Sequence, residues 1–183
     1  MALSVVFLIA YGVAWYRGRA NITSALFLGG VGTLIALGVN LLIAHTAREL
    51  RPYDTLPHVL VLVARANDFS FPSDHSVVAG GLTAAVTFAA LLAHRKGSNA
   101  GSLTRSLTRL ATLNGVLGVL LCFGRVYVGA HYPGDVIAGY VISAAITLLV
   151  MTARKPLSRL IAFAVSTPLG VALVRPVDSV ANG

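Results

Sequence analysis

Charged residues and cysteines are both scarce in this chain of 183 residues. Only 11% of its residues are charged and 56% are hydrophobic, whereas soluble globular domains carry about 25% charged residues. This composition excludes an ordinary soluble domain. The single cysteine, Cys122, excludes a disulfide framework, and its place within an apolar run is typical of a buried, inert thiol.

Acidic residues are also few, with six against fourteen lysines and arginines, so the formal net charge is +8. In a soluble protein this balance raises the question of nucleic-acid binding. Here the basic residues cluster in short loops between apolar segments, which a membrane explains better. We therefore predict membrane lipids as partners and no nucleic acid.

Long apolar runs are abundant. Crossing a bilayer takes about 20 mostly apolar residues, and five runs are predicted to do so, at roughly 2–16, 22–44, 75–93, 107–124 and 135–152. The first run lacks the basic flank and cleavage pattern of a signal peptide. A further run, Leu160–Val174, is short and contains a proline, so a sixth span and an interfacial helix both stay open.

The predicted fold class is therefore all-α. We expect one membrane-embedded domain over residues 1–183, built as a helical bundle with five core spans and a sixth candidate. Three of the predicted loops are basic and free of acids; they hold Arg17, Arg19, Arg95, Lys96, Arg105, Arg109, Arg154, Lys155 and Arg159. The positive-inside rule predicts that these loops are cytoplasmic and that the other two loops face outward.

Both outward loops carry ionisable residues near helix ends, where charges are costly and usually functional. In the second, His131 and Asp135 are four residues apart, and Pro133 suits a first helical position, so both side chains share a face at the start of the fifth span. A carboxylate beside an imidazole fixes its tautomer and favours the imidazolium. Arg125 suits phosphate oxygens. A capping aspartate and an arginine reaching lipid headgroups form the alternative.

The first outward loop ends in "FPSDH". Ser73 or Asp74 is a good N-cap for the third span. A helix N-terminus also attracts anions, and the Ser73 hydroxyl with His75 would add a donor and a proton source. A simple cap and an anion site are both open for this segment.

Earlier in the same loop stands "RELRPY". Arg48 and Arg51 are three residues apart and would face the same way on a helix that Pro52 ends. One arginine near a headgroup plane is unremarkable. Two arginines on the side of the membrane that holds both histidines favour an anion site.

Taken together, "RP" at 51–52, "PSDH" at 72–75 and Arg125-x5-His131-x3-Asp135 resemble the three motifs of the type 2 phosphatidic acid phosphatase (PAP2) superfamily. Order, spacing and predicted topology agree over residues of about 40 to 140. "FPSDH" and "RVYVGAHYPGDV" look more specifically like undecaprenyl-diphosphatases of the bacitracin-resistance type. These are small enzymes of the bacterial cytoplasmic membrane that recycle the lipid carrier of cell-wall synthesis.

The resemblance implies a mechanism. His131 would attack the terminal phosphorus to give a phosphohistidine, Asp135 would hold its ring, and His75 would protonate the leaving oxygen and then activate water. The implied phosphate-binding residues are Arg51, Ser73 and Arg125, with Arg48 and His45 as further candidates. The implied substrate is a polyprenyl diphosphate, and its site faces outward.

The chain departs from the family pattern at three positions. The family lysine falls on Ala44, and His45 and Arg48 are neighbours that could substitute for it. Gly124 stands where the family has a serine, and Asp74 replaces the glycine of the second motif. These changes leave the nucleophile and the acid in place but alter the phosphate cage.

We expect no metal and no cofactor, because arginines would do the metal's work beside the two histidines. Phosphatidate, phosphatidylglycerol phosphate and other prenyl phosphates are alternative substrates. A vanadium haloperoxidase shares the anion cage but does not span membranes. A non-enzymatic transporter subunit would leave three matched motifs on one membrane face unexplained.

Overall fold

The structure is a computed structural model that describes residues 1–95 and 101–153. Throughout these residues the regular elements are helices, and no strand occurs among them. The elements are α1 (Ala2–Tyr16), α2 (Ala20–Ala47), α3 (Pro52–Thr55), α4 (Asp74–His94), α5 (Gly101–Tyr127), α6 (Pro133–Val150) and the 3-10 turn η2 (Met151–Ala153). The predicted all-α class is confirmed. The Leu160–Val174 run lies outside the described residues, as do Lys96, Arg154, Lys155 and Arg159.

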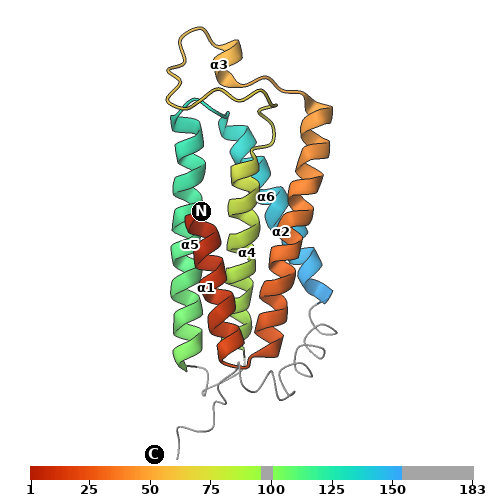
Figure 1. Ribbon diagram of the computed structural model, residues 1–183, viewed down its shortest axis with the longest axis vertical. Helices are drawn as coiled ribbons and strands as arrows, with labels where there is room; N and C mark the ends of the chain where they lie inside the picture. Colours follow the sequence, from red (N-terminus) through yellow and green to blue (C-terminus); the bar gives the residue numbers. More distant parts are fainter. Residues whose placement is uncertain (96–100, 154–183) are drawn as a thin grey trace, which may run out of the picture.

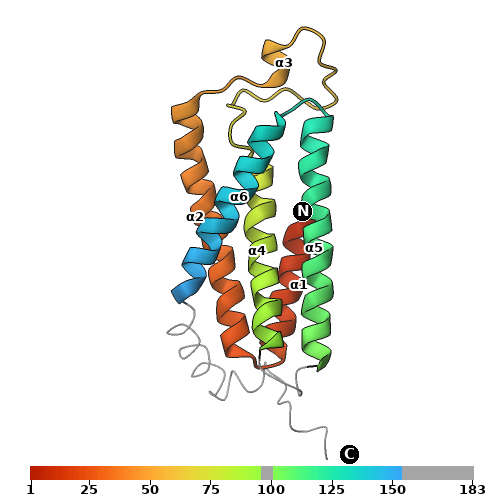
Figure 2. The ribbon, with the colours of Figure 1, turned by 180° about the vertical axis from the view of Figure 1, so that it is seen from behind.

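Helix α4 is the centre of the bundle (Figures 1 and 2). It packs against α2, α5 and α6, while α1 lies against α5, α2 and α4. Small residues on α4 allow this close approach, as is usual for helices that pack in membranes. At Gly80, for example, an added Cβ would lie 2.1 Å from the Tyr140 carbonyl oxygen on α6.

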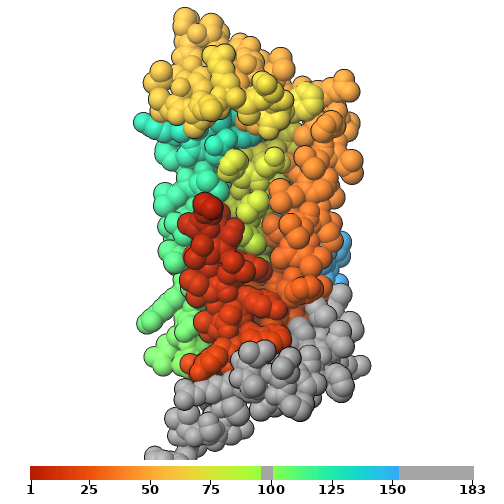
Figure 3. Space-filling model, viewed as in Figure 1, coloured from red at the N-terminus to blue at the C-terminus, as the bar shows by residue number. Residues whose placement is uncertain are grey.

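Four of the described helices, α2, α4, α5 and α6, are long and apolar enough to cross a bilayer. Helix α1 has the bounds predicted for the first span, but its 15 residues rise only about 22 Å. A hydrocarbon core is about 30 Å thick. Figures 1 and 3 show α1 beside the lower part of the bundle, with the outer part of α4 visible above it.

Several predicted helix ends differ from the observed ones. Helix α2 covers Ala20–Ala47 rather than 22–44, and α6 ends at Val150 rather than 152. Helix α5 begins at Gly101 rather than 107, so Arg105 and Arg109, expected in a loop, lie within its first turns. A helix continues through such polar residues because it satisfies its own backbone groups, and long basic side chains reach water from it.

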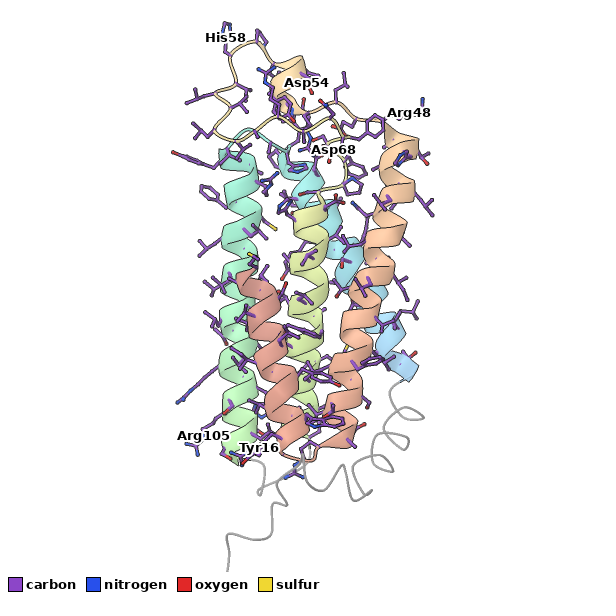
Figure 4. All side chains as sticks on the ribbon, in the orientation of Figure 1. Tyr16, Arg48, Asp54, His58, Asp68 and Arg105 are labelled. Atoms are coloured by element: carbon purple, nitrogen blue, oxygen red, sulfur yellow. The ribbon has the colours of Figure 1, made fainter. Side chains whose placement is uncertain are left out.

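The two ends of the bundle differ in charge, as the loop pattern predicted. Tyr16, where α1 ends, and Arg105 lie at one end, and Arg48, Asp54, His58 and Asp68 lie at the other (Figure 4). The long connection between α2 and α4 covers this second end and includes α3 (Figure 1). The residues singled out by the three motifs belong to this end.

Candidate active site

The start of α4 is fixed by an asparagine on α2. Buried Asn40 donates from Nδ2 to the Pro72 carbonyl oxygen at 3.1 Å and to Asp74 Oδ1 at 2.6 Å. These bonds locate the first turn of α4, which carries His75. Sequence reasoning missed Asn40, although a lone amide within a long run without charges was a usable signal.

Ser73 occupies the N-cap position of α4, as one of the two predicted alternatives had it. Its hydroxyl makes no capping bond to the helix, and Oγ is buried without a hydrogen-bond partner in the described part of the chain. The Ser73 N–H donates to the Asp135 carbonyl oxygen at 3.2 Å. Ser73 therefore joins α4 to the start of α6.

His131 lies just before α6, and its two ring nitrogens have distinct partners. Nδ1 is 2.8 Å from the Ser70 carbonyl oxygen, and Nε2 is 3.1 Å from Arg51 Nη1. A carbonyl oxygen only accepts and a guanidinium only donates. The proton therefore belongs on Nδ1, and the lone pair of Nε2 points toward Arg51. Imidazole in this tautomer has its nucleophilic nitrogen on the arginine side.

Asp135 lies behind His131 rather than in contact with the cavity. Pro133 is the first residue of α6, as predicted, and the Asp135 carboxylate is buried at the third position. Its Oδ2 accepts from the Tyr132 N–H at 2.9 Å and from the Ser70 hydroxyl, and lies 3.6 Å from His131 Nδ1. The predicted proximity of Asp135 and His131 is confirmed, but the Ser70 carbonyl holds the ring and Asp135 holds Ser70.

The charge of the His131 ring depends on more than its neighbouring carboxylate. Burial, and next the positive charge of Arg51, lower the pKa of His131 to about 4. The Ser70 carbonyl and the Asp135 carboxylate act in the opposite direction, but they do not offset burial and the arginines. Asp135 thus favours the imidazolium, as expected, but burial and the arginines outweigh it. The ring is therefore neutral near pH 7.

Arg51 is 5% exposed and is held from both sides. Its Nη1 donates to the Ala130 carbonyl oxygen at 2.9 Å as well as to His131. Its Nε and Nη2 donate to Asp68 Oδ1 at 3.0 and 2.6 Å. Sequence reasoning missed Asp68, because nothing in the motif pattern relates it to an arginine 17 residues away.

Arg48 does not share a helix face with Arg51, contrary to the prediction. Helix α2 ends at Ala47, and Arg48 adopts a left-handed backbone with φ of 49°. Its Nε turns back to the His45 carbonyl oxygen at 3.1 Å. Pro52 begins α3 instead of ending a helix. The bend between α2 and α3 separates the two arginines.

A cavity of about 160 Å³ lies where these elements meet. Its walls combine both motif histidines with two arginines and two carboxylates; the lining residues are Leu41, Ala44, His45, Arg51, Ala66, Asp68, Phe69, Pro72, Asp74, His75, Arg125 and His131. Ala44, the position of the family lysine, lines it together with the neighbouring His45. Arg48, Ser73 and Asp135 do not line it.

Arg125 approaches the cavity from α5. Its Nε is buried, and no hydrogen-bond partner for it occurs in residues 1–95 and 101–153. A buried guanidinium N–H without a partner costs free energy unless something binds it. With Arg51 nearby, this unpaired donor makes the cavity suited to an anion.

The donors around the cavity do not form a metal site. Among the residues that the structure describes, no group of three or more His, Cys, Asp or Glu side chains could hold a metal ion. Cys122 is half-buried on α5 rather than fully buried, and its thiol donates to the Ser76 hydroxyl at 3.4 Å. The site therefore consists of imidazoles, guanidinium groups and carboxylates.

The sequence was compared with models of known protein families. The model of the PAP2 superfamily matches residues 24–159, which include every residue that lines the cavity. The chain belongs to the PAP2 superfamily. This membership agrees with the observed all-α membrane bundle and with the three motifs at one end of it.

Several curated proteins resemble this PAP2 chain. Undecaprenyl-diphosphatase BcrC of Bacillus subtilis is 30% identical over 136 residues, which cover 74% of this chain and 61% of that protein. The undecaprenyl-diphosphatase of Sulfolobus acidocaldarius is 29% identical over 119 residues, 65% of this chain and 50% of that protein. Putative undecaprenyl-diphosphatase YbjG of Escherichia coli is 38% identical over 109 residues, 57% of this chain and 46% of that protein.

The similarity thus spans less than two thirds of each of these relatives. No solved structure matches the chain.

Proposed function

We propose that this PAP2 chain is a membrane lipid phosphatase that removes the terminal phosphate of a polyprenyl diphosphate of the undecaprenyl type. The observation that supports this proposal most directly is that one cavity at one end of the membrane bundle is lined by His131, His75, Arg51 and Arg125. Two of the relatives are named undecaprenyl-diphosphatases and the third a putative one, which supports this substrate class. The reaction would recycle the lipid carrier of cell-wall synthesis.

In the first step, His131 Nε2 attacks the terminal phosphorus in line with the bridging oxygen. The N–P bond forms, the P–O bond breaks, and His75 gives its proton to the departing oxygen of the polyprenyl phosphate. The low pKa of His131 supports this role, because the attacking nitrogen is unprotonated. Arg51 Nη1, 3.1 Å from Nε2, must turn from the nitrogen onto the incoming phosphate.

In the second step, water attacks the phosphohistidine. His75, now neutral, takes a proton from the water, the N–P bond breaks, and inorganic phosphate leaves with His131 restored. Arg51 and Arg125 stabilise negative charge on the equatorial oxygens in both steps. Asp135 stabilises the positive charge that the His131 ring carries in the intermediate, 3.6 Å from Nδ1.

The position of the site suits a lipid substrate. The cavity lies at the end of the bundle away from the basic residues Arg17, Arg19 and Arg105, so the diphosphate would enter from outside the cytoplasmic membrane of a bacterium while the tail stays in the leaflet. We further propose that residues 1–183 form a single membrane-embedded domain.

The test uses purified protein in detergent with polyprenyl diphosphate and, separately, phosphatidate as substrates. Phosphate release is expected from the diphosphate, and it should be lost in His131→Ala and in His75→Ala. His58→Ala, which removes an exposed histidine of the outer loop, is the matched control and should keep wild-type rates. Wild-type rates in both site variants would remove the mechanism, and faster hydrolysis of phosphatidate would reassign the substrate.

Excess chelator is a second arm of this experiment. If the reaction needs no metal, phosphate release should continue in EDTA. Complete loss of phosphate release in EDTA would contradict the role given to Arg51 and Arg125.

A further inference from the structure

Arg51 already holds an anion in the structure, and that anion is part of the chain. The Asp68 carboxylate receives bonds from both Nε and Nη2 of Arg51, the shorter at 2.6 Å. Arg51 is 5% exposed, whereas Asp68 is 57% exposed and comes from the loop that covers the site. Asp68 also lines the cavity (Figure 4 labels it at this end of the bundle).

We propose that Asp68 is an internal competitor for the phosphate site: its carboxylate occupies Arg51 until a terminal phosphate displaces it. This inference rests on the proposed function, because the displacing group is the phosphate to be hydrolysed. It assigns Asp68 a role in selecting the ligand, where the motifs assign it none.

The pair with Arg51 is built so that one partner can leave. Arg51 keeps its bond to the Ala130 carbonyl oxygen and stays buried when Asp68 departs. Asp68, by contrast, is more than half exposed, so water solvates its carboxylate once it is released, and a pair with an exposed partner contributes little stability. Movement of one loop side chain is then enough to free Nη2, while Nε keeps its bond to the Asp68 main-chain carbonyl oxygen at 3.3 Å.

Selectivity follows from charge. A terminal phosphate carries about two negative charges and reaches Arg51 and Arg125 together. The Nε of Arg125 still lacks a partner within the described segments. A phosphodiester headgroup carries a single charge, the same as Asp68, and gains little by replacing it. Asp68 imposes the same penalty on both kinds of ligand, so a terminal phosphate, with its extra charge and its contact to Arg125, still binds, whereas the diester lipids around the protein do not.

A positioning role for Asp68 makes the opposite prediction. If the carboxylate served only to orient Arg51, its removal would leave the guanidinium misplaced and weaken phosphate binding. If it competes, its removal strengthens binding. The sign of the change separates the two roles.

The first experiment measures the dissociation constant of inorganic phosphate for wild type, Asp68→Asn and Asp68→Ala in detergent. Loss of the charged competitor should tighten phosphate about tenfold, near the low end of what a charge-assisted hydrogen bond contributes. Asp54→Asn, an exposed acid of α3, is the control for net charge and should bind phosphate as wild type does. Unchanged or weaker binding in both Asp68 variants would overturn the inference.

A second probe is dimethyl phosphate, a diester with one negative charge. It should inhibit wild type poorly and should inhibit Asp68→Asn at concentrations about tenfold lower. Dimethyl phosphate should inhibit the control Asp54→Asn as poorly as it inhibits wild type. If dimethyl phosphate inhibits wild type and Asp68→Asn equally, Asp68 does not compete with anions for Arg51.

A third measurement leaves Asp68 in place. A spin label attached at Asn67→Cys in a Cys122→Ala background reports on the exposed loop beside Asp68. Saturating phosphate should increase the mobility of the label, because Asp68 leaves Arg51. An unchanged spectrum under conditions where phosphate binds would contradict displacement.

Failure of the function and failure of this inference have different signatures. If wild type hydrolyses no phosphate ester, the proposed function fails whatever Asp68 does. If wild type hydrolyses polyprenyl diphosphate but the Asp68 variants bind phosphate no better, only the inference fails.

Discussion

Asp135→Asn separates the charge of the carboxylate from the orientation of the His131 ring. The carbonyl oxygen of the substituted amide can still accept from the Tyr132 N–H, and the Ser70 carbonyl oxygen, not Asp135, accepts from His131 Nδ1. The variant should therefore keep the tautomer and lose only the negative charge. That charge matters when the ring becomes positive in the proposed phosphohistidine.

The size of the effect follows from the 3.6 Å separation of Asp135 Oδ2 and His131 Nδ1. Unit charges at that distance interact by about 4.6 kcal/mol at an effective dielectric constant of about 20. With roughly half of the charge developed at the transition state, the loss is about 2.3 kcal/mol, or about 50-fold in kcat. KM should change little, because Asp135 does not line the cavity.

The assay is steady-state phosphate release from polyprenyl diphosphate in detergent, with thermal unfolding and phosphate binding to show that the variant is folded. A kcat within about threefold of wild type would refute the electrostatic role of Asp135. A loss near 10⁴-fold, the size seen when a carboxylate sets a histidine tautomer, would show that Asp135 rather than Ser70 orients the ring. A change in KM alone would place Asp135 in contact with substrate.

Two further predictions concern charges at the cavity. Because burial and Arg51 hold the pKa of His131 near 4, the ring should become charged only as the pH falls through that value. Arg51→Gln should raise this pKa toward the ordinary range, as measured from ¹⁵N-histidine NMR shifts assigned with His131→Ala. An unchanged pKa would contradict the role of Arg51. Ala44→Lys, at a cavity-lining position, should add a third cation and lower the phosphate dissociation constant about tenfold, as measured by titration calorimetry. A dissociation constant equal to that of wild type would show that position 44 does not face the anion.

The helices could be predicted from the sequence because an apolar run in a bilayer has to satisfy its backbone groups internally. All five predicted spans are helices in the structure, and the predicted bounds of α1 and α4 agree closely with the observed ones. The start of α5 at Gly101 was predicted too far along the chain. A helix near the membrane surface tolerates arginines, and in a sequence such arginines look like loop residues.

Local parts of the site were predictable for a similar reason. His131 and Asp135 are four residues apart, and the short segment through the N-cap Tyr132 into the first turn of α6 brings the imidazole and the carboxylate together. Arg51 and His75 could be identified from their motifs, but their approach to His131 required the fold.

The partners that set the chemistry of the site depend on tertiary structure. Ser70 holds His131 across 61 residues, Asp68 holds Arg51 across 17, and Asn40 holds Asp74 across 34. Such pairings have no periodicity in the sequence, because they exist only where loops and helix ends meet. The sequence by itself determined a membrane bundle with its motif histidines, arginines and aspartates at one end. Only the tertiary structure decided that His131 is neutral and that Asp68 pairs with Arg51, because burial and contacts across the chain set both.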